Sequence, residues 1–134
     1  MGERMTRVEN IMHWANQWRT LRAWKRDLSE VQIKISKRIN ASRLGTCWST
    51  EQRITIYQGA SLVEELDTLL HELAHAATIG AHHDARWQEV YAAAVTEVTG
   101  IVVVPVAYDY HFVARAGEEA LKAWWQCRRQ ETCL

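Results

Sequence analysis

The sequence predicts an α+β fold in which helices pack against a small three-stranded sheet. Apolar residues recur at helical spacing over residues 62–79 and again over about 84–99. Apolar and polar residues alternate over 31–36, and short apolar stretches at 44–48 and 52–57 have the composition of strands. The 134 residues contain no visible repeat, low-complexity stretch or linker, so we expect one domain with a substantial core.

The first expected element is an amphipathic helix over about residues 8–28. Three tryptophans in this stretch interleave with basic residues, an arrangement that can stack on nucleic-acid bases. Tryptophans more often anchor a core, and we favour that interpretation. The apolar residues at helical spacing are Val8, Ile11, Met12, Ala15, Trp18, Leu21 and Trp24.

Three strands are expected next. Val31, Ile33 and Ile35 alternate with polar residues, which is typical of a half-buried strand. The stretches 44–48 and 52–57 are separated by a short polar segment, Ser-Thr-Glu. That spacing predicts a hairpin between the second and third strands.

Two adjacent helices should follow the sheet. Ser61 and Glu64 form a capping box at the start of the helix over 62–79, and Gly80 is placed to end it. The next helix should end at Gly100. Beyond it, the sequence predicts an extended apolar segment and then a last helix, over 101–106 and 118–128 respectively.

The formal net charge is zero, but the charge is unevenly distributed. Residues 1–43 carry ten Lys/Arg against four Asp/Glu, whereas residues 44–134 carry six against twelve. The basic third suits either a nucleic-acid contact or a solvated helix face, and the neutral overall charge leaves both open. The candidate nucleic-acid contacts are Arg19, Arg22, Lys25, Arg26, Lys34, Lys37 and Arg38.

The apolar runs are too short to span a bilayer, and the N-terminus lacks the apolar core of a signal peptide. We therefore expect no membrane partner. The three cysteines are odd in number and sparse, so we expect no disulfide framework and a reducing, cytoplasmic location.

The chemical signal of the sequence is His71-Glu72-Leu-Ala-His75 on the predicted helix over 62–79. Residues four apart lie on one helix face, so both imidazoles can bind one zinc ion. Glu72 lies about 100° around the helix from His71, outside the ligand shell but near a zinc-bound water. A carboxylate there can act as general base and return the proton to a leaving amine.

A catalytic zinc usually takes three protein ligands and leaves one position open. The third ligand should follow the expected helix end at Gly80, where the chain can fold back toward the metal. On the residues alone, several side chains compete for this role: His82, His83, Asp84, Glu89 and Glu97.

Tyrosine and histidine side chains also follow the second of these helices. Tyr108, Tyr110 and His111 are candidate contacts to the substrate or to the oxyanion that forms during hydrolysis. Simple packing or surface roles are the more common fate of such residues.

The sequence resembles the SprT-like metallopeptidases, whose animal members include the Spartan protease. Asp67-Thr-Leu-Leu-His-Glu-Leu-Ala-His-Ala is similar to the zinc helix of that family almost position by position. Residues 31–53, with Arg-Leu-Gly-Thr-Cys in the middle, look like the strand and glycine turn before that helix, and 53–56 looks like its edge strand. The family's third ligand is a histidine four residues before a large aromatic, which selects His83, four before Trp87.

The resemblance implies a zincin-like minimal metalloprotease domain: a three-stranded sheet packed by an active-site helix and flanking helices. It implies a single domain over 1–134, with a recognisable core at about 8–99 and a C-terminal extension at 100–134. The implied activity is that of a zinc endopeptidase. The best-known family members act on proteins crosslinked to DNA, which would place this chain at the nucleoid and give its basic region a purpose. Many members also carry a C-terminal zinc ribbon, and the spacing of Cys127 and Cys133 does not match one.

Two other functions remain open on the sequence. One is a DNA-binding module with a structural zinc, although such a site has no use for Glu72. The other is a metal-dependent amidase or peptidase for small or cell-wall peptides. An extended cleft beside a strand edge would favour a protein or peptide substrate, and a closed pocket a small one.

Overall fold

The computed structural model describes residues 5–37, 44–59 and 61–130. The candidate contact Arg38 lies outside them. Four α-helices and a three-stranded mixed sheet make up this part of the chain, as the predicted α+β class requires. None of the described helices is long and apolar enough to cross a membrane. The elements are α1 (Arg7–Trp18), β1 (Gln32–Ser36), β2 (Gly45–Trp48), β3 (Arg53–Tyr57), α2 (Leu62–Ala77), α3 (Ala85–Thr99) and α4 (Tyr110–Gln130).

The sheet has the strand order β1-β3-β2. β2 and β3 pair antiparallel through a short 3₁₀ turn, Ser49–Glu51, which confirms the predicted hairpin. β1 pairs parallel with β3, with Ile33 opposite Ile54. The expectation that residues 53–56 form the edge strand is wrong: β3 is central, and β1 and β2 are the two edge strands.

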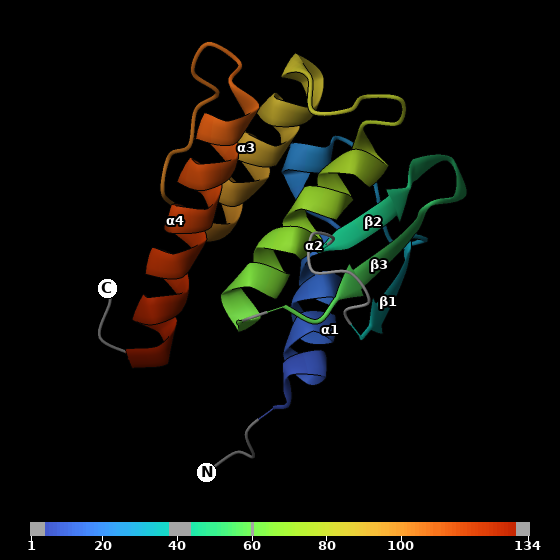
Figure 1. Cartoon of the computed structure of the whole chain (residues 1–134), viewed down its shortest axis with the longest axis vertical. Helices are drawn as coiled ribbons and strands as arrows, with labels where there is room; N and C mark the ends of the chain where they lie inside the picture. Colours follow the sequence, from blue (N-terminus) through green and yellow to red (C-terminus); the bar gives the residue numbers. More distant parts are fainter. Residues whose placement is uncertain (1–4, 38–43, 60, 131–134) are drawn as a thin grey trace.

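Helix α2 occupies the middle of the molecule, between the sheet and the α3–α4 pair (Figure 1). Its leucines at positions 66, 69, 70 and 73 are fully buried, because almost every side of the helix meets another element. Ile54 and Ile56 of β3 supply the buried face of the sheet. A helix enclosed in this way holds its side chains in fixed positions.

The first helix is shorter than predicted. α1 ends at Trp18 and is followed by a 3₁₀ turn, Arg22–Trp24, rather than running to residue 28. The indole of Trp24 folds back and donates a hydrogen bond to the Trp18 carbonyl at 2.6 Å. The spacing of three between Leu21 and Trp24 suits a 3₁₀ helix as well as an α-helix, so periodicity alone did not separate them.

The last helix is longer than predicted, starting at Tyr110 instead of residue 118. Asp109 caps it, accepting hydrogen bonds from the amides of His111 and Phe112. Gly117 lies inside the helix because Tyr91 packs against it: a Cβ at this position would lie 2.2 Å from the Tyr91 hydroxyl oxygen. The glycine therefore serves close helix packing and does not end the helix.

The segment over 101–106, which we expected to be extended, belongs to none of the strands of the described sheet. Among the described cysteines, Cys47 is a free thiol and Cys127 is disulfide-bonded. The sequence led us to expect no disulfide framework, and the structure has a disulfide bond at Cys127.

Candidate metal centre

The first two histidines are positioned by α2. Ser61 caps this helix by accepting a hydrogen bond from the Glu64 amide at 3.1 Å, as its place in the predicted capping box requires. The helix then runs without interruption to Ala77. His71 and His75 are four residues apart, and so project from the same face.

A tight turn returns the chain to these histidines. After α2 ends, Gly80 adopts a positive φ of 86°, which glycine tolerates without strain. The Arg86 guanidinium donates to the Ile79 carbonyl at 2.6 Å and holds the turn against the start of α3. The turn brings His83 back over the end of α2.

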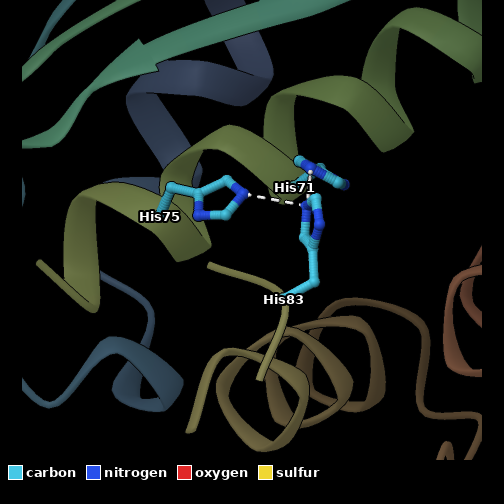
Figure 2. A group of neighbouring side chains, drawn as sticks. All are labelled: His71, His75 and His83. Carbon is cyan, nitrogen blue, oxygen red and sulfur yellow. Dashed lines mark hydrogen bonds between the residues drawn. The ribbon is translucent and has the colours of Figure 1, made fainter. Parts of the chain in front are cut away.

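The three imidazoles converge on one point (Figure 2). The Nε2 atom of His83 lies 3.1 Å from that of His75 and 3.0 Å from that of His71. A tetrahedral zinc ion with bonds of about 2.0–2.1 Å holds its ligand nitrogens about 3.3–3.4 Å apart. The spacing of the nitrogens therefore fits a zinc ion, and these three residues are positioned to bind a metal.

The site keeps its imidazoles uncharged. Burial, reinforced by the neighbouring imidazoles, lowers the pKa of His71 to about 3 and that of His75 to about 4. Burial also lowers the pKa of His83, with His82 and His111 adding to the effect. Neutral imidazoles have free nitrogen lone pairs at neutral pH, which is the form that binds metal.

Trp87 packs against the side chains of all three histidines. It is fully buried, and its ring centroid lies 4.7 Å from that of His71, 5.3 Å from His75 and 4.9 Å from His83. Its indole also donates to the His71 carbonyl at 3.3 Å. The aromatic residue that singled out His83 in the sequence thus contacts all three histidines.

Gln88 is a supporting residue that the sequence did not reveal. Its buried amide nitrogen donates at 2.9 Å to the carbonyls of both His83 and Tyr108. This bridge ties the backbone of a candidate ligand to the segment that leads into α4. A single glutamine in an amphipathic helix gives no sequence signal of such a role.

Glu72 lies between the histidines and β2. A Cβ on Gly45 would lie 3.0 Å from the Glu72 Oε2 atom and 2.6 Å from Thr68, so only glycine allows β2 to approach α2 this closely. Burial and then the charge of Glu72 raise the pKa of Cys47, on the same strand, to about 12. Cys47 is therefore a protonated thiol beside the Glu72 carboxylate.

A cleft of about 870 Å³ is lined by the three histidines, Glu72 and Cys47. One wall is residues 44–47 at β2, and the floor is α2 from Asp67 to His75. Tyr110 and Ala114 of α4 supply part of the opposite wall. From Asp67 to His75 the helix α2 advances by eight residue steps, which corresponds to about 12 Å at a rise of 1.5 Å per residue.

The other candidates for the third ligand are placed elsewhere or occupied. The Asp84 carboxylate caps α3 by accepting from the Trp87 amide, and Glu97 accepts from two backbone amides of the 3₁₀ turn at 22–24. Glu89 is exposed, and His82 lines the cleft without joining the converging nitrogens.

Of the three residues considered for substrate contacts, the structure brings Tyr110 into the cleft. Its ring stacks on His83 with centroids 4.0 Å apart and an interplanar angle of 21°. Burial, and then the charges of Asp67 and Glu72, raise the pKa of its phenol, so the hydroxyl stays protonated. Tyr108 and His111 are exposed and lie outside the cleft lining, although His111 is near enough to affect the pKa of His83.

The basic candidates lie on elements that do not line the cleft. Arg19 has an internal structural role, since it donates to the Val31 carbonyl at 3.1 Å and to Asn16. The remaining described members are exposed, on the 3₁₀ turn after α1 and along or just after β1: Arg22, Lys25, Arg26, Lys34 and Lys37.

Comparison with known proteins gives one finding. The model of the SprT-like family matches residues 8–106, nearly three quarters of the chain. The match covers all three histidines, Glu72 and the sheet, and ends before α4. No curated protein and no solved structure matches the chain.

Proposed function

The chain belongs to the SprT-like family, a family of metallopeptidase-like domains, and on that premise we propose that it is a zinc-dependent endopeptidase with Glu72 as general base. The observation that carries the proposal is the meeting of three uncharged, converging imidazoles and the Glu72 carboxylate in one cleft beside a strand edge.

The ion would be held by His71, His75 and His83. Zinc bound there supplies a Lewis acid, which polarises a carbonyl group and lowers the pKa of a water molecule to about 7. Within the described part of the chain, the cluster offers three ligand side chains and no fourth. Structural zinc sites close all four positions with protein ligands, so the open position favours catalysis over a structural zinc in a DNA-binding module.

Glu72 performs the proton transfers. Its carboxylate accepts a proton from water as the water oxygen bonds to the scissile carbonyl carbon. It then delivers that proton to the amine as the C–N bond breaks. Its position supports this role, because Glu72 lines the cleft between the histidines and β2, where Gly45 packs against it and Thr68.

Tyr110 is the group we assign to the carbonyl oxygen. Its protonated hydroxyl can donate a hydrogen bond, and its stacking on His83 holds it next to the metal ligands. A donor fixed at the point where negative charge develops stabilises the transition state. Tyr110 belongs to α4, so this part of the site lies beyond the residues that the family model matches.

The shape of the cleft favours a peptide over a small amide. Its floor of about 12 Å along α2 accommodates three to four extended residues at about 3.3 Å each. β2 is the edge strand on the cleft side of the described sheet, where residues 44–47 line the cleft, so a peptide can lie alongside it as an added strand. An amidase for small or cell-wall peptides would need a more closed pocket.

DNA-associated proteins are the proposed substrates, in a cytoplasmic, nucleoid-associated setting. The exposed basic side chains on the 3₁₀ turn at 22–24 and on β1 support this part of the proposal. Because these elements do not line the cleft, DNA bound there would leave the cleft open to a protein substrate.

The test is cleavage of an unfolded generic protein and of a DNA-binding protein, each with and without single-stranded DNA. Zinc-loaded wild type should cut, and Glu72→Gln should retain zinc while its rate falls about 10²–10⁴-fold, the usual contribution of a general base. Full activity in Glu72→Gln would disprove the base assignment. Stimulation by DNA would support the DNA-associated substrate class, and cleavage indifferent to DNA would remove it. If zinc-loaded wild type cuts neither protein, the endopeptidase proposal fails.

A further inference from the structure

We propose that the end of the cleft next to Asp67 is a subsite for a positively charged substrate group, a lysine or arginine side chain close to the bond that is cut. The inference rests on the proposed function and adds to it a substrate preference.

Asp67 belongs to the cleft itself. It lies on α2 one turn before His71 and lines the same cavity as the histidines and Glu72. The Tyr91 hydroxyl on α3 donates to its Oδ1 atom at 2.6 Å and holds the carboxyl in place. The residue keeps part of its surface exposed, so a group that enters the cleft can reach it.

Asp67 is separate from the metal cluster. The lowered pKa of His71 is caused by burial, His75 and His83, and Asp67 is not among its causes. The metal-binding group of the described residues likewise consists of the three histidines alone. The function proposed above therefore gives this carboxyl no task.

The surroundings of Asp67 favour a cation. The acidic groups nearby are Glu64 on α2 and Glu118 on α4, and both raise the pKa of Asp67. The one basic group that acts on it, Lys122, is 3.5 Å from Glu118 and is thus already paired. The charged groups that act on Asp67 are thus two acidic and one basic, and this net negative surrounding attracts a basic side chain.

Burial destabilises the ionised form of Asp67 when no cation occupies the subsite. It raises the pKa of Asp67 from its ordinary value of 3.8 to about 7, because the charged form loses its water. A neutral acceptor would satisfy the Tyr91 hydroxyl without that penalty. A cation in contact with the carboxylate offsets the penalty, because it replaces the lost hydration with a direct charge interaction.

The distance along α2 suits a side chain adjacent to the scissile bond. One helical turn separates Asp67 from His71, about 5–6 Å along the axis. Lysine and arginine side chains can span this distance from a residue next to the bond. The small residues Thr68 and Ala114 line the cleft beside it and leave space for the aliphatic part of such a side chain.

The experiment measures binding instead of turnover. Zinc-loaded Glu72→Gln protein is titrated at pH 8 with fluorescent peptides of identical sequence except for one residue, lysine or methionine, placed in turn at the positions around the central bond. At one position the lysine peptide should bind at least about tenfold more tightly. Asp67→Asn, added to Glu72→Gln, should reduce this ratio to within about twofold, since asparagine keeps the acceptor for Tyr91 but has no charge.

Glu119→Gln is the matched control. It removes one carboxylate from an exposed position of α4 outside the cleft lining, so the lysine preference should persist. Circular dichroism and zinc content establish that each variant is folded and loaded. Equal binding of the two peptides, or a preference that survives Asp67→Asn, would overturn the subsite alone. Absence of binding by every peptide would overturn the peptidase proposal together with it.

Discussion

His71 and Asp67 lie one turn apart on α2, and both are largely enclosed while still opening onto the same cleft. Burial acts on them in opposite directions. It lowers the pKa of the imidazole to about 3 and raises the pKa of the carboxyl to about 7. In each case the buried environment disfavours the charged form.

The two residues nevertheless differ in what they can do when neutral. A neutral imidazole is ready to bind a metal, so burial prepares His71 for its proposed role. A neutral carboxyl is a weak partner for a cation, so Asp67 must ionise when a basic group arrives. One site is therefore preorganised by burial, and the other is completed by its ligand.

The largest expected effect comes from a substitution that disrupts the three-histidine site. His75→Ala removes one of three converging nitrogens, and should weaken zinc affinity by more than about a thousandfold, beyond the 10–100-fold typical of outer-shell changes. Peptide cleavage should disappear with the metal. Competition with a chromophoric zinc chelator measures the affinity.

His82→Ala is the control for that loss. His82 lines the same cleft, but its ring is not part of the converging group. Its replacement should change zinc affinity by no more than about twofold, the scale of an ordinary surface substitution. A large loss with His82→Ala and a small one with His75→Ala would show that the ligand set is wrong.

The second prediction concerns the effect of Asp67 on the free energy of unfolding of the zinc-free protein. Since the pKa of Asp67 is higher in the folded state, the carboxyl destabilises the fold progressively as pH rises from about 4 to 7. Asp67→Asn should therefore stabilise the zinc-free protein by about 2–4 kcal/mol at pH 8, from 1.36 kcal/mol per pKa unit.

The gain should shrink at pH 5, where nearly all of the wild-type carboxyl is still protonated in the folded state. Urea unfolding of both proteins at the two pH values, with chelator present, measures the difference. A loss of stability in Asp67→Asn at pH 8 would mean that the carboxylate is stabilised in the absence of a ligand, and the contrast with His71 would not hold.

The sequence was most informative where one local pattern determines both structure and chemistry. The helical spacing around His71 and His75 predicted α2, and the polar segment between two apolar stretches predicted the β2–β3 hairpin. The SprT-like resemblance and the α+β class are both confirmed. In each of these cases, neighbours in sequence are also neighbours in space.

The sequence was least informative where the structure depends on partners far along the chain. The strand order could not be read from alternation, because that pattern does not show which strand becomes central. The last helix begins before Gly117, and the close approach of Tyr91 that accounts for this glycine comes from another helix. The partnership of Asp67 with Tyr91 joins residues 24 positions apart on different helices, and no local pattern indicates it.

The smallest expected effect concerns Tyr110, which lies between the two regions, since the charges of both Asp67 and Glu72 raise the pKa of its phenol. Tyr110→Phe keeps the ring that stacks on His83 and removes only the hydroxyl. If this hydroxyl stabilises the developing oxyanion, kcat should fall about 10- to 100-fold, with KM and zinc content nearly unchanged. Steady-state kinetics with a zinc assay separate these quantities. An unchanged kcat would limit Tyr110 to packing against His83, and α4 would then shape the cleft without taking part in its chemistry.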